Sequence, residues 1–297
     1  MINSNLVILF FGTFFLSVFG TIYYRKFAIK NNILANLNFR TLHEKPTPRG
    51  GGVIFSSVFI ISVIILYSIN EINFNLLLVF ALGGFFAALV GYLDDLIGIK
   101  APIKLLLQIF MSLWLLYFFD GGLLNMVSLL NGWPSWLISV FLLTWLINAY
   151  NFIDGIDGMA ISGAILILAT LSLTLIISNN TSNLLILFLT LLSSCFGFLF
   201  FNWPKATIFM GDSGSIFLGY IFGAFIIYST MNGDIHFVTW LIVFGYYLAD
   251  TTLTTSIRLI TNKKWYYTHR SHAYQNLARV LNNHFKITTG VLIYHLF

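Results

Sequence analysis

Long apolar runs, separated by short polar segments, follow one another along the whole chain of 297 residues. The hydrocarbon core of a bilayer is ~30 Å thick, and an α-helix needs about 20 mostly apolar residues to cross it. Nine runs approach or exceed that length, and the sequence therefore predicts nine membrane-spanning helices, over Leu6–Tyr23, Val53–Ile69, Phe74–Leu93, Ile103–Phe119, Trp136–Ala149, Ile161–Ile177, Leu184–Phe201, Ile208–Ser229 and Phe237–Leu259.

A tenth apolar run, Ile287–Phe297, has eleven residues. At 1.5 Å per residue it reaches about 16 Å, so we do not expect it to cross a membrane alone. The pattern contains no soluble domain, linker or low-complexity tract. We therefore predict an all-α, polytopic membrane protein with about nine to ten transmembrane helices, forming a single integral membrane domain over residues 1–297.

Composition supports a membrane protein and excludes an ordinary soluble one. Apolar and aromatic residues make up 58% of the chain and charged residues 8%, whereas soluble domains carry roughly 25% charged residues. The formal net charge of +5 comes from few charges, and we expect no nucleic-acid partner. The single cysteine, Cys195, excludes an intramolecular disulfide framework.

The basic residues give the chain an orientation. If the predicted helices alternate across the membrane, all fifteen Lys and Arg residues fall in or beside one set of loops, near 24–52, 94–104, 148–160, 202–212 and 258–286. Basic loops face the cytoplasm, so we predict that these loops form a cytoplasmic active face and that the N-terminus lies outside. No basic residue precedes the first run, which indicates a retained span rather than a cleaved signal peptide.

Most acidic residues also fall on the predicted cytoplasmic face. Ionisable groups in or beside a bilayer are costly and indicate functional sites, although any single acid could instead cap a helix or balance a nearby Lys or Arg. Asp94 and Asp95 are adjacent in GYLDDLIGIKAPIK, and they repel each other unless a cation or a shared proton relieves them. With Lys100 and Lys104 close behind, the pair suits a magnesium diphosphate, whereas two adjacent Asp residues alone could be an N-cap pair.

A second motif, NAYNFIDGIDGMA, gives the strongest signal from spacing alone. Asn148, Asn151, Asp154 and Asp157 recur every three residues, which places them along one side of a helical turn or a tight loop. Glycines follow both Asp residues and allow the backbone to approach a ligand. Four polar groups in this register before an apolar run are hard to explain as capping, so we predict a binding site.

Two further motifs suit phosphate. In FMGDSGSIFLGY, Asp212 lies at the start of a predicted helix, where free amides attract anions and one Asp can hold a hard cation against the same phosphate. Taken alone, Asp212 is a helix N-cap. In KPTPRGGGVIF, Lys45, Arg49 and three glycines could cradle a diphosphate or a lipid phosphate, but the segment lacks the GK followed by Ser or Thr of a Walker loop.

The basic segment TNKKWYYTHRSHAYQNLARV contains the donors His269, Arg270 and His272. Arg offers a bidentate fork and His donates at either nitrogen, so this cluster suits phosphate or sugar hydroxyls. The alternatives are a zinc site and a juxtamembrane patch for anionic lipid. We interpret Asp250, within the last predicted span, as a structural polar contact, with a role at a lipid head group as the alternative.

These five motifs, in this order and on one face, resemble the polyprenyl-phosphate N-acetylhexosamine-1-phosphate transferases, or glycosyltransferase family 4. The resemblance covers nearly the whole chain, and HRSHAYQ is most similar to the bacterial branch that initiates O-antigen synthesis. It implies transfer of a sugar 1-phosphate from a UDP-N-acetylhexosamine to undecaprenyl phosphate, with release of UMP, in the bacterial inner (cytoplasmic) membrane. GlcNAc is the default sugar, with FucNAc, QuiNAc and GalNAc as alternatives. The implied cofactor is Mg²⁺, with Mn²⁺ as a substitute, and the expected partners are membrane lipid and a second copy in a homodimer.

The resemblance also implies residue roles. Asp212 and Asn151 match positions that hold the metal, and Asp94 and Asp95 match a pair that handles a proton or orients the lipid phosphate. Asp94, Asp95 and Asp212 are therefore the expected catalytic residues, with a two-step route through a phosphorylated Asp212 as the rival mechanism. Lys104 matches a phosphate contact and Asp157 a uracil contact within the expected substrate-binding set of Lys104, Asn148, Asp154, Asp157, His269, Arg270, His272, Lys45 and Arg49.

One feature departs from the family, and two other functions compete with it. Family members commonly end with a full further helix, whereas here the last apolar run stops at Phe297. An intramembrane, magnesium-dependent prenyltransferase would carry acids spaced four apart rather than three. A secondary transporter would place ionisable groups near the bilayer midplane, where Asp250 is the one candidate.

Overall fold

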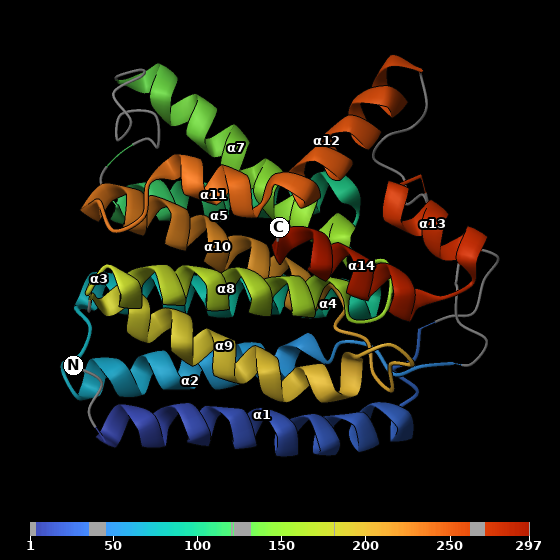
Figure 1. Ribbon diagram of the computed structural model, residues 1–297, viewed down its shortest axis with the longest axis horizontal. Coiled ribbons are helices and arrows are strands. Elements are labelled where there is room, and N and C mark those ends of the chain that lie inside the picture. The colour runs from blue at the N-terminus through green and yellow to red at the C-terminus, as the bar shows by residue number, and fades with distance from the viewer. Residues whose placement is uncertain are drawn as a thin grey trace.

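The computed structural model describes residues 4–35, 46–119, 121, 132–180, 182–261 and 271–296. Within these ranges the chain is helical (Figure 1), apart from an isolated backbone pairing of Leu34 with Pro48. The helices in chain order are α1 (Ser4–Lys30), α2 (Gly52–Ser68), α3 (Phe74–Leu77), the π-helix η1 (Leu78–Gly83), α4 (Gly84–Ile97), α5 (Ala101–Phe118), α7 (Trp133–Ile153), α8 (Met159–Ile177), α9 (Asn183–Asn202), α10 (Asp212–Asn232), α11 (Phe237–Val243), α12 (Gly245–Ile260), α13 (Ala273–Leu281) and α14 (His284–Leu296).

The chain is all-helical and polytopic in character, as the apolar pattern predicts. In the described part of the chain, seven helical stretches are long and apolar enough to cross a membrane, namely α1, the continuous Phe74–Ile97, α5, α7, α8, α9 and α10. α2 is equally apolar but has 17 residues. Each predicted span therefore contains helix, while the total of nine to ten crossings stays a prediction.

The last predicted span, Phe237–Leu259, forms two helices instead of one. α11 ends at Val243 after seven residues, and α12 begins at Gly245. Glycine inside a helix costs about 1 kcal/mol relative to Ala, which favours a break at this point. The indole Nε1 of Trp240 in α11 donates to Ser229 Oγ of α10 at 2.8 Å, so α11 stays against the bundle. α12 projects away from it, as one end of α7 does (Figure 1).

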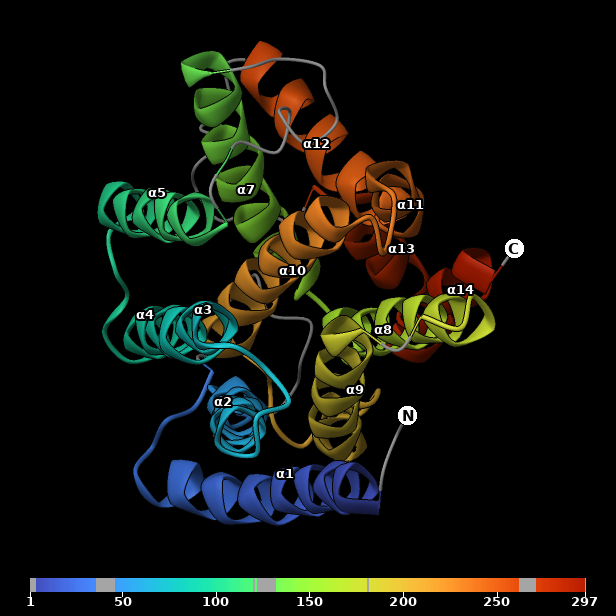
Figure 2. The ribbon, with the colours of Figure 1, turned by 90° about the vertical axis from the view of Figure 1, so that its left-hand side faces the viewer.

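α10 lies at the centre of the bundle, with the other helices around it (Figure 2). Every residue from Ser213 to Ile227 is buried, as expected of a helix that is apolar on all sides. α10 packs against α2, α4 and α7. Aromatic rings fill this core; Phe217, for example, meets Phe59 edge to face with ring centroids 5.9 Å apart.

The π-helix η1 interrupts the third predicted span. A π turn contains one more residue than an α turn and leaves backbone carbonyls without their usual partners. Side chains from two neighbouring helices donate hydrogen bonds to carbonyls of η1: Tyr220 Oη donates to the Val79 carbonyl at 2.9 Å, and Trp114 Nε1 donates to the Leu78 carbonyl at 3.4 Å. The interruption is therefore stabilised by α10 and α5.

Glycines allow two helices, α2 and α4, to approach the first turn of α10 closely. A Cβ atom on Gly91 of α4 would overlap the backbone carbonyl of Asp212, and a Cβ atom on Gly52 of α2 would overlap the backbone of Gly214. Only a residue without a side chain fits such contacts. The convergence brings the motifs of α2, α4 and α10 into one place.

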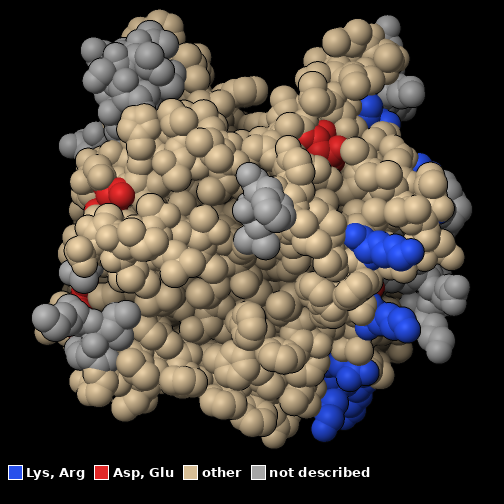
Figure 3. All heavy atoms as spheres, in the orientation of Figure 1, with Lys and Arg blue, Asp and Glu red and all other residues tan. Residues whose placement is uncertain are grey.

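Basic side chains gather at one end of the molecule (Figure 3). They occupy the last turns of α1, the start of α5, the α9–α10 connection and the segments around α13, as in Arg25, Lys26, Lys30, Lys100, Lys104, Lys205, Arg258, Arg279 and Lys286. This distribution agrees with the basic asymmetry that the sequence predicts.

The close approach of α4 and α10 generates a prediction about stability. Replacing Gly91 by Ala should lower the free energy of unfolding by about 1–3 kcal/mol, the usual cost of overpacking, because the new methyl group must displace the backbone of Asp212. Thermal unfolding in detergent measures the change. Gly12 of α1 has nothing within 4 Å of a Cβ atom, so Gly12→Ala is the matched control, and equal stability of the two variants would contradict this account.

Candidate active site

The N-terminus of α10 is capped by a carboxylate from another helix. Asp95 of α4 accepts hydrogen bonds from the backbone N–H groups of Asp212 and Ser213, each at 3.0 Å. Gly211 precedes the helix with φ of 72°, and a Cβ atom there would collide with the Asp95 carboxylate. The glycine before Asp212 is therefore required both by backbone conformation and by the closeness of Asp95.

Arg49 neutralises this buried carboxylate. Its Nη2 lies 3.0 Å from Asp95 Oδ1 and donates at 3.4 Å to the backbone carbonyl of Asp94. The segment that carries Arg49 is fixed by backbone bonds to the loop before α10, from Phe209 N–H to the Pro48 carbonyl at 2.8 Å and from Gly51 N–H to the Phe209 carbonyl at 2.9 Å. The glycine-rich segment thus presents Arg49 to the start of α10.

Lys104 joins the first and third acidic motifs. Its Nζ donates to Asp94 Oδ2 at 2.7 Å and to Asp212 Oδ2 at 3.0 Å. The other oxygen of Asp94 accepts from the Ile99 N–H at 2.6 Å. Charge-assisted bonds of this kind are short and strong. Lys104 therefore links the Asp94 side chain of α4 to the Asp212 side chain of α10.

Asn148 and Asn151, the first two of the four residues spaced three apart, have different partners. Asn151 in the last turn of α7 donates to Ser215 Oγ at 2.8 Å and also interacts with the Asp212 carboxylate. Asn148, one turn earlier, donates instead to Gln108 Oε1 of α5 at 2.7 Å. Asn148 therefore ties α7 to α5 and is not among the residues that line the cavity described below. Its contact with substrate stays a prediction.

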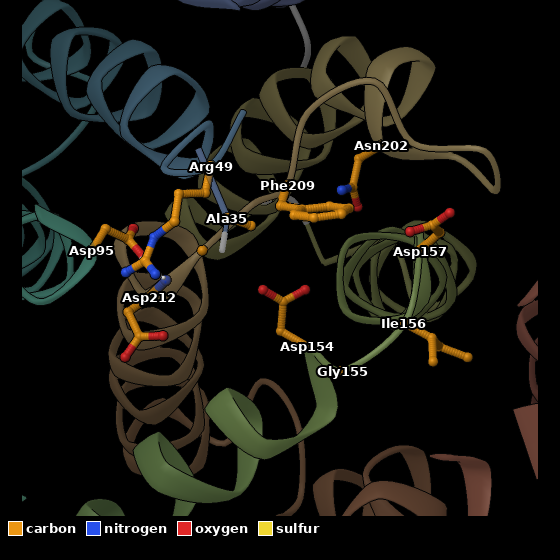
Figure 4. A pocket seen from close by; sticks show the side chains of 11 residues that line it. Ala35, Arg49, Asp95, Asp154, Gly155, Ile156, Asp157, Asn202, Phe209 and Asp212 are labelled. Carbon is orange, nitrogen blue, oxygen red and sulfur yellow. Dashed lines mark hydrogen bonds and ion pairs between the residues drawn. The ribbon is translucent and has the colours of Figure 1, made fainter. Parts of the chain in front are cut away.

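A cavity of about 210 Å³ opens beside Asp212 (Figure 4). The Asp154 side chain points into it from the end of α7, with Arg49 and Asp212 on one side and Asp157 on the other. The residues that line the cavity are Ala35, Arg49, Asp95, Asp154, Gly155, Ile156, Asp157, Asn202, Phe209, Gly211 and Asp212. Four carboxylates and one guanidinium therefore face a space large enough for part of a nucleotide.

The excess of carboxylates affects Asp154 directly. Burial, and then the nearby carboxylates of Asp212 and Asp95, raise the pKa of Asp154 well above its usual value, because both oppose a further negative charge. The Gly211 N–H offsets part of this effect. A divalent cation would relieve the same repulsion.

The donor set suits magnesium rather than zinc. Within the described ranges, no three His, Cys, Asp or Glu side chains lie close enough to form a ready metal site. Mg²⁺ commonly takes one or two carboxylates and completes its shell with water and substrate phosphates. Asp212, whose side chain is 27% exposed beside the cavity, fits this smaller set together with the neighbouring Asn151 amide.

The basic motif near the C-terminus lies partly outside the described residues, because the structure does not describe His269 and Arg270. Lys45 of the glycine-rich motif also lies outside them. His272 is described and is buried, with 2% of its surface exposed. Its Nδ1 lies 3.1 Å from Asp250 Oδ2, and Asp250 Oδ1 accepts from the Ala273 N–H at 2.8 Å. Asp250 thus caps α13 and orients His272, in agreement with its interpretation as a structural contact.

Sequence reasoning did not find several residues of the site. Phe209 and Asn202 line the cavity without any distinctive spacing. Their contribution depends on the path of the α9–α10 loop, which no local pattern specifies.

Fold and site together define a class of protein, an all-helical membrane protein whose acidic and basic motifs converge on a single helix N-terminus at one end of the bundle. The chain belongs to glycosyl transferase family 4, whose family model matches residues 77–230. The matched region runs from α3 to α10 and includes Asp94, Lys104, Asn151 and Asp212. It leaves out Arg49, His272 and α14.

Similar proteins come from several bacteria. A "Probable undecaprenyl-phosphate N-acetylglucosaminyl 1-phosphate transferase" of Bacillus subtilis is 30% identical over 248 residues, which cover 81% of this chain and 68% of the relative. A phospho-N-acetylmuramoyl-pentapeptide-transferase of Prochlorococcus marinus is 32% identical over 193 residues, which cover 59% and 52%. A protein of the same description from Kosmotoga olearia is 29% identical over 285 residues, which cover 88% and 84%. The matched part of the chain thus spans about half the length of the Prochlorococcus marinus relative, 68% of the Bacillus subtilis relative and 84% of the Kosmotoga olearia relative.

The capping of α10 by Asp95 leads to a second prediction. Asp95→Asn should lower the free energy of unfolding by about 1–3 kcal/mol, since one backbone N–H of α10 loses its acceptor and Arg49 loses its buried counter-ion. Thermal unfolding in detergent tests the loss. Asp234→Asn is a suitable control, because Asp234 Oδ1 accepts from a neutral partner, Asn180; a change at Asp95 no larger than this control would contradict the capping role.

Proposed function

We propose that the protein transfers an N-acetylhexosamine 1-phosphate from a UDP-sugar to undecaprenyl phosphate and releases UMP. The observation that carries the proposal is the meeting of Asp94, Lys104, Asn151 and Asp212 at one helix N-terminus beside an acidic cavity. Family membership and the description of the Bacillus subtilis relative support this reaction. The magnesium dependence is part of the proposal and rests on the donor set around Asp212.

Positioning and charge compensation account for most of the proposed catalysis. A phosphate oxygen of the lipid attacks the β-phosphorus of the donor; the bond from that phosphorus to the bridging oxygen breaks, and the electron pair leaves with UMP. Lys104, which pairs with Asp212, and Arg49, which pairs with Asp95 at the same helix end, supply positive charge. When bound by Asp212 and Asn151, Mg²⁺ supplies further charge compensation on the diphosphate.

The two adjacent acids take different roles in this proposal. Both oxygens of Asp95 accept backbone N–H groups and one also pairs with Arg49, so Asp95 serves as a positioning residue. Asp94 keeps contact with Lys104, and we assign it to take a proton from the acceptor. A phosphate monoester has a second pKa of about 6 and is largely ionised near pH 7, so little proton transfer is required.

The cellular setting follows the basic asymmetry of the chain. We place the site on the cytoplasmic face of a bacterial inner membrane, with nine to ten crossings, membrane lipid as the surrounding partner and a homodimer as the assembly. Initiation of a lipid-linked surface glycan such as O-antigen is the pathway we favour, on the basis of the HRSHAYQ motif. The convergence of acids at helix ends favours group transfer over a secondary transporter, and family membership favours it over a prenyltransferase.

The assay is UMP release by the purified protein in detergent with undecaprenyl phosphate, Mg²⁺ and each of UDP-GlcNAc, UDP-GalNAc, UDP-FucNAc and UDP-QuiNAc. We expect UMP with one sugar or a subset of them, and none when lipid is omitted or EDTA is added. Release of UMP without lipid would identify a hydrolase, and full activity in EDTA would contradict the magnesium site.

Two substitutions test the site itself. Asp212→Asn should reduce turnover by about 10²–10³-fold or more. Asp212 is both the expected metal ligand and a partner of Lys104, and Asn carries no charge for either contact. Lys104→Met should produce a loss of similar size. Asp234→Asn, far from the motifs in sequence, serves as the control, and near wild-type rates for Asp212→Asn would remove Asp212 from the mechanism in both its one-step and two-step forms.

A further inference from the structure

Three segments of the chain meet at Asp157. This residue lies in the connection between α7 and α8 and is 5% exposed. Its Oδ2 accepts hydrogen bonds from the backbone N–H groups of Lys205 and Ala206 in the α9–α10 loop, each at 3.1 Å. The third segment is α14, which contacts the carboxylate, the amide and the carbonyl of Asp157.

α14 contacts Asp157 through two side chains on one face. Thr288, fully buried, donates from Oγ1 to the Asp157 carbonyl at 2.9 Å. Nδ1 of His284 lies 3.4 Å from Asp157 Oδ2 and 3.5 Å from the Asp157 backbone nitrogen. A protonated Nδ1 donates to the carboxylate, whereas an unprotonated Nδ1 accepts from the N–H, so the imidazole contacts Asp157 in either tautomer.

α14 also contacts the loop that supplies the two amides. The ring of Phe285 meets Trp203 edge to face, with centroids 6.0 Å apart. The next residue, Pro204, packs so closely on Gly158 that a Cβ atom there would lie 3.1 Å from its Cδ. The two loops and α14 therefore form one packed unit around Asp157.

The α7–α8 connection, which α14 contacts at Asp157, forms one wall of the cavity. Asp154, Gly155, Ile156 and Asp157 all line it, and Asp157 lies across the cavity from Asp212 (Figure 4). The residues expected to act on the reacting phosphate, such as Asp94 and Lys104, have no hydrogen bond to His284 or Thr288. A change in α14 would therefore act first on Asp157, and on Asp94 and Lys104 only indirectly.

We propose that α14 is part of the donor-binding site, with His284 and Thr288 as positioning residues that set Asp157 and the wall beside it. This inference rests on the proposed function, since it assigns the wall to the nucleotide part of the UDP-sugar. α14 lies outside the region that the family model matches, so the assignment comes from the contacts of this chain. It predicts that α14 controls the affinity for the donor and not the rate of transfer.

The experiment compares Thr288→Val and His284→Leu with the wild type. With UDP-GlcNAc as the probe, or the preferred sugar nucleotide if the panel identifies another, we expect KM for the donor to rise about three- to tenfold, the effect of losing one hydrogen bond. The value of kcat should stay within about twofold, and KM for undecaprenyl phosphate should not change. Binding of the same nucleotide, measured by calorimetry without lipid, should weaken by the same factor as KM.

Matched variants separate positioning from folding. Thr289→Val makes the same chemical change at the adjacent residue, whose Oγ1 has no hydrogen-bond partner in the described part of the chain, and it should leave KM unchanged. Thr288→Ser keeps the hydroxyl, and His284→Asn keeps a polar atom near the position of Nδ1, so both should restore donor affinity. His284→Gln, which extends its polar group toward the Nε2 position, should not.

Four outcomes would overturn the inference. An unchanged donor KM in both deletion variants would show that α14 does not act on the donor, and an equal rise in the two KM values would show that it acts on the fold as a whole. A fall in kcat alone would place α14 in the transfer step. Absence of turnover and of nucleotide binding in the wild type itself would reject the proposed function and this inference together, whereas wild-type activity with insensitive variants rejects the inference alone.

Discussion

The first turn of α10 has four backbone N–H groups that no residue of the helix can satisfy, and the structure depends on how they are paired. Gly211 accepts from Gly214 and Ser215 through its carbonyl, each at 3.1 Å, and Asp95 accepts from Asp212 and Ser213. Backbone N–H groups that are buried need hydrogen-bond partners within the protein. The need to bring a carboxylate to this point explains the glycines of α2 and α4, the positive φ of Gly211 and the presence of Arg49.

Once that helix end is fixed, Asp212 lies between two different environments. On one side Lys104 and Asp94 approach it from α5 and α4. On the other side lies the cavity, where Arg49 is the one positive side chain among the described lining residues. Burial and the neighbouring carboxylates raise the pKa of Asp154 there. In the proposed reaction, the positive side chains would compensate the charge of a phosphate group, and Asp212 would hold the cation.

The sequence predicts the main features of this site because its signals are local. Apolar runs identify the helices, and adjacent acids followed by Lys104 indicate a charged contact that the fold contains. The spacing of three in NAYNFIDGIDGMA identifies the right segment but not its outcome, because α7 ends at Ile153; Asn148 stays within a helix interface while Asp154 enters the cavity. The division of roles between Asp94 and Asp95 depends on the rotation of α4 relative to α10, which no local pattern specifies. For the division of Phe237–Leu259 into two helices, Gly245 was the local signal, and packing against α10 keeps α11 in place.

The π-helix η1 has a consequence for the direction in which the acidic pair points. Each residue of an α-helix turns the chain by about 100°, and a π turn inserts one residue into that progression. The interruption at Leu78–Gly83 lies upstream of Asp94 and Asp95 in the same continuous helical stretch. It therefore sets the angular phase of everything that follows, so that a hydrogen bond between Tyr220 and Val79, more than three turns away from the acids, helps to decide which face of α4 they occupy. Alignment of the acidic pair with the start of α10 is in this sense a property of the helix's winding as much as of its side chains.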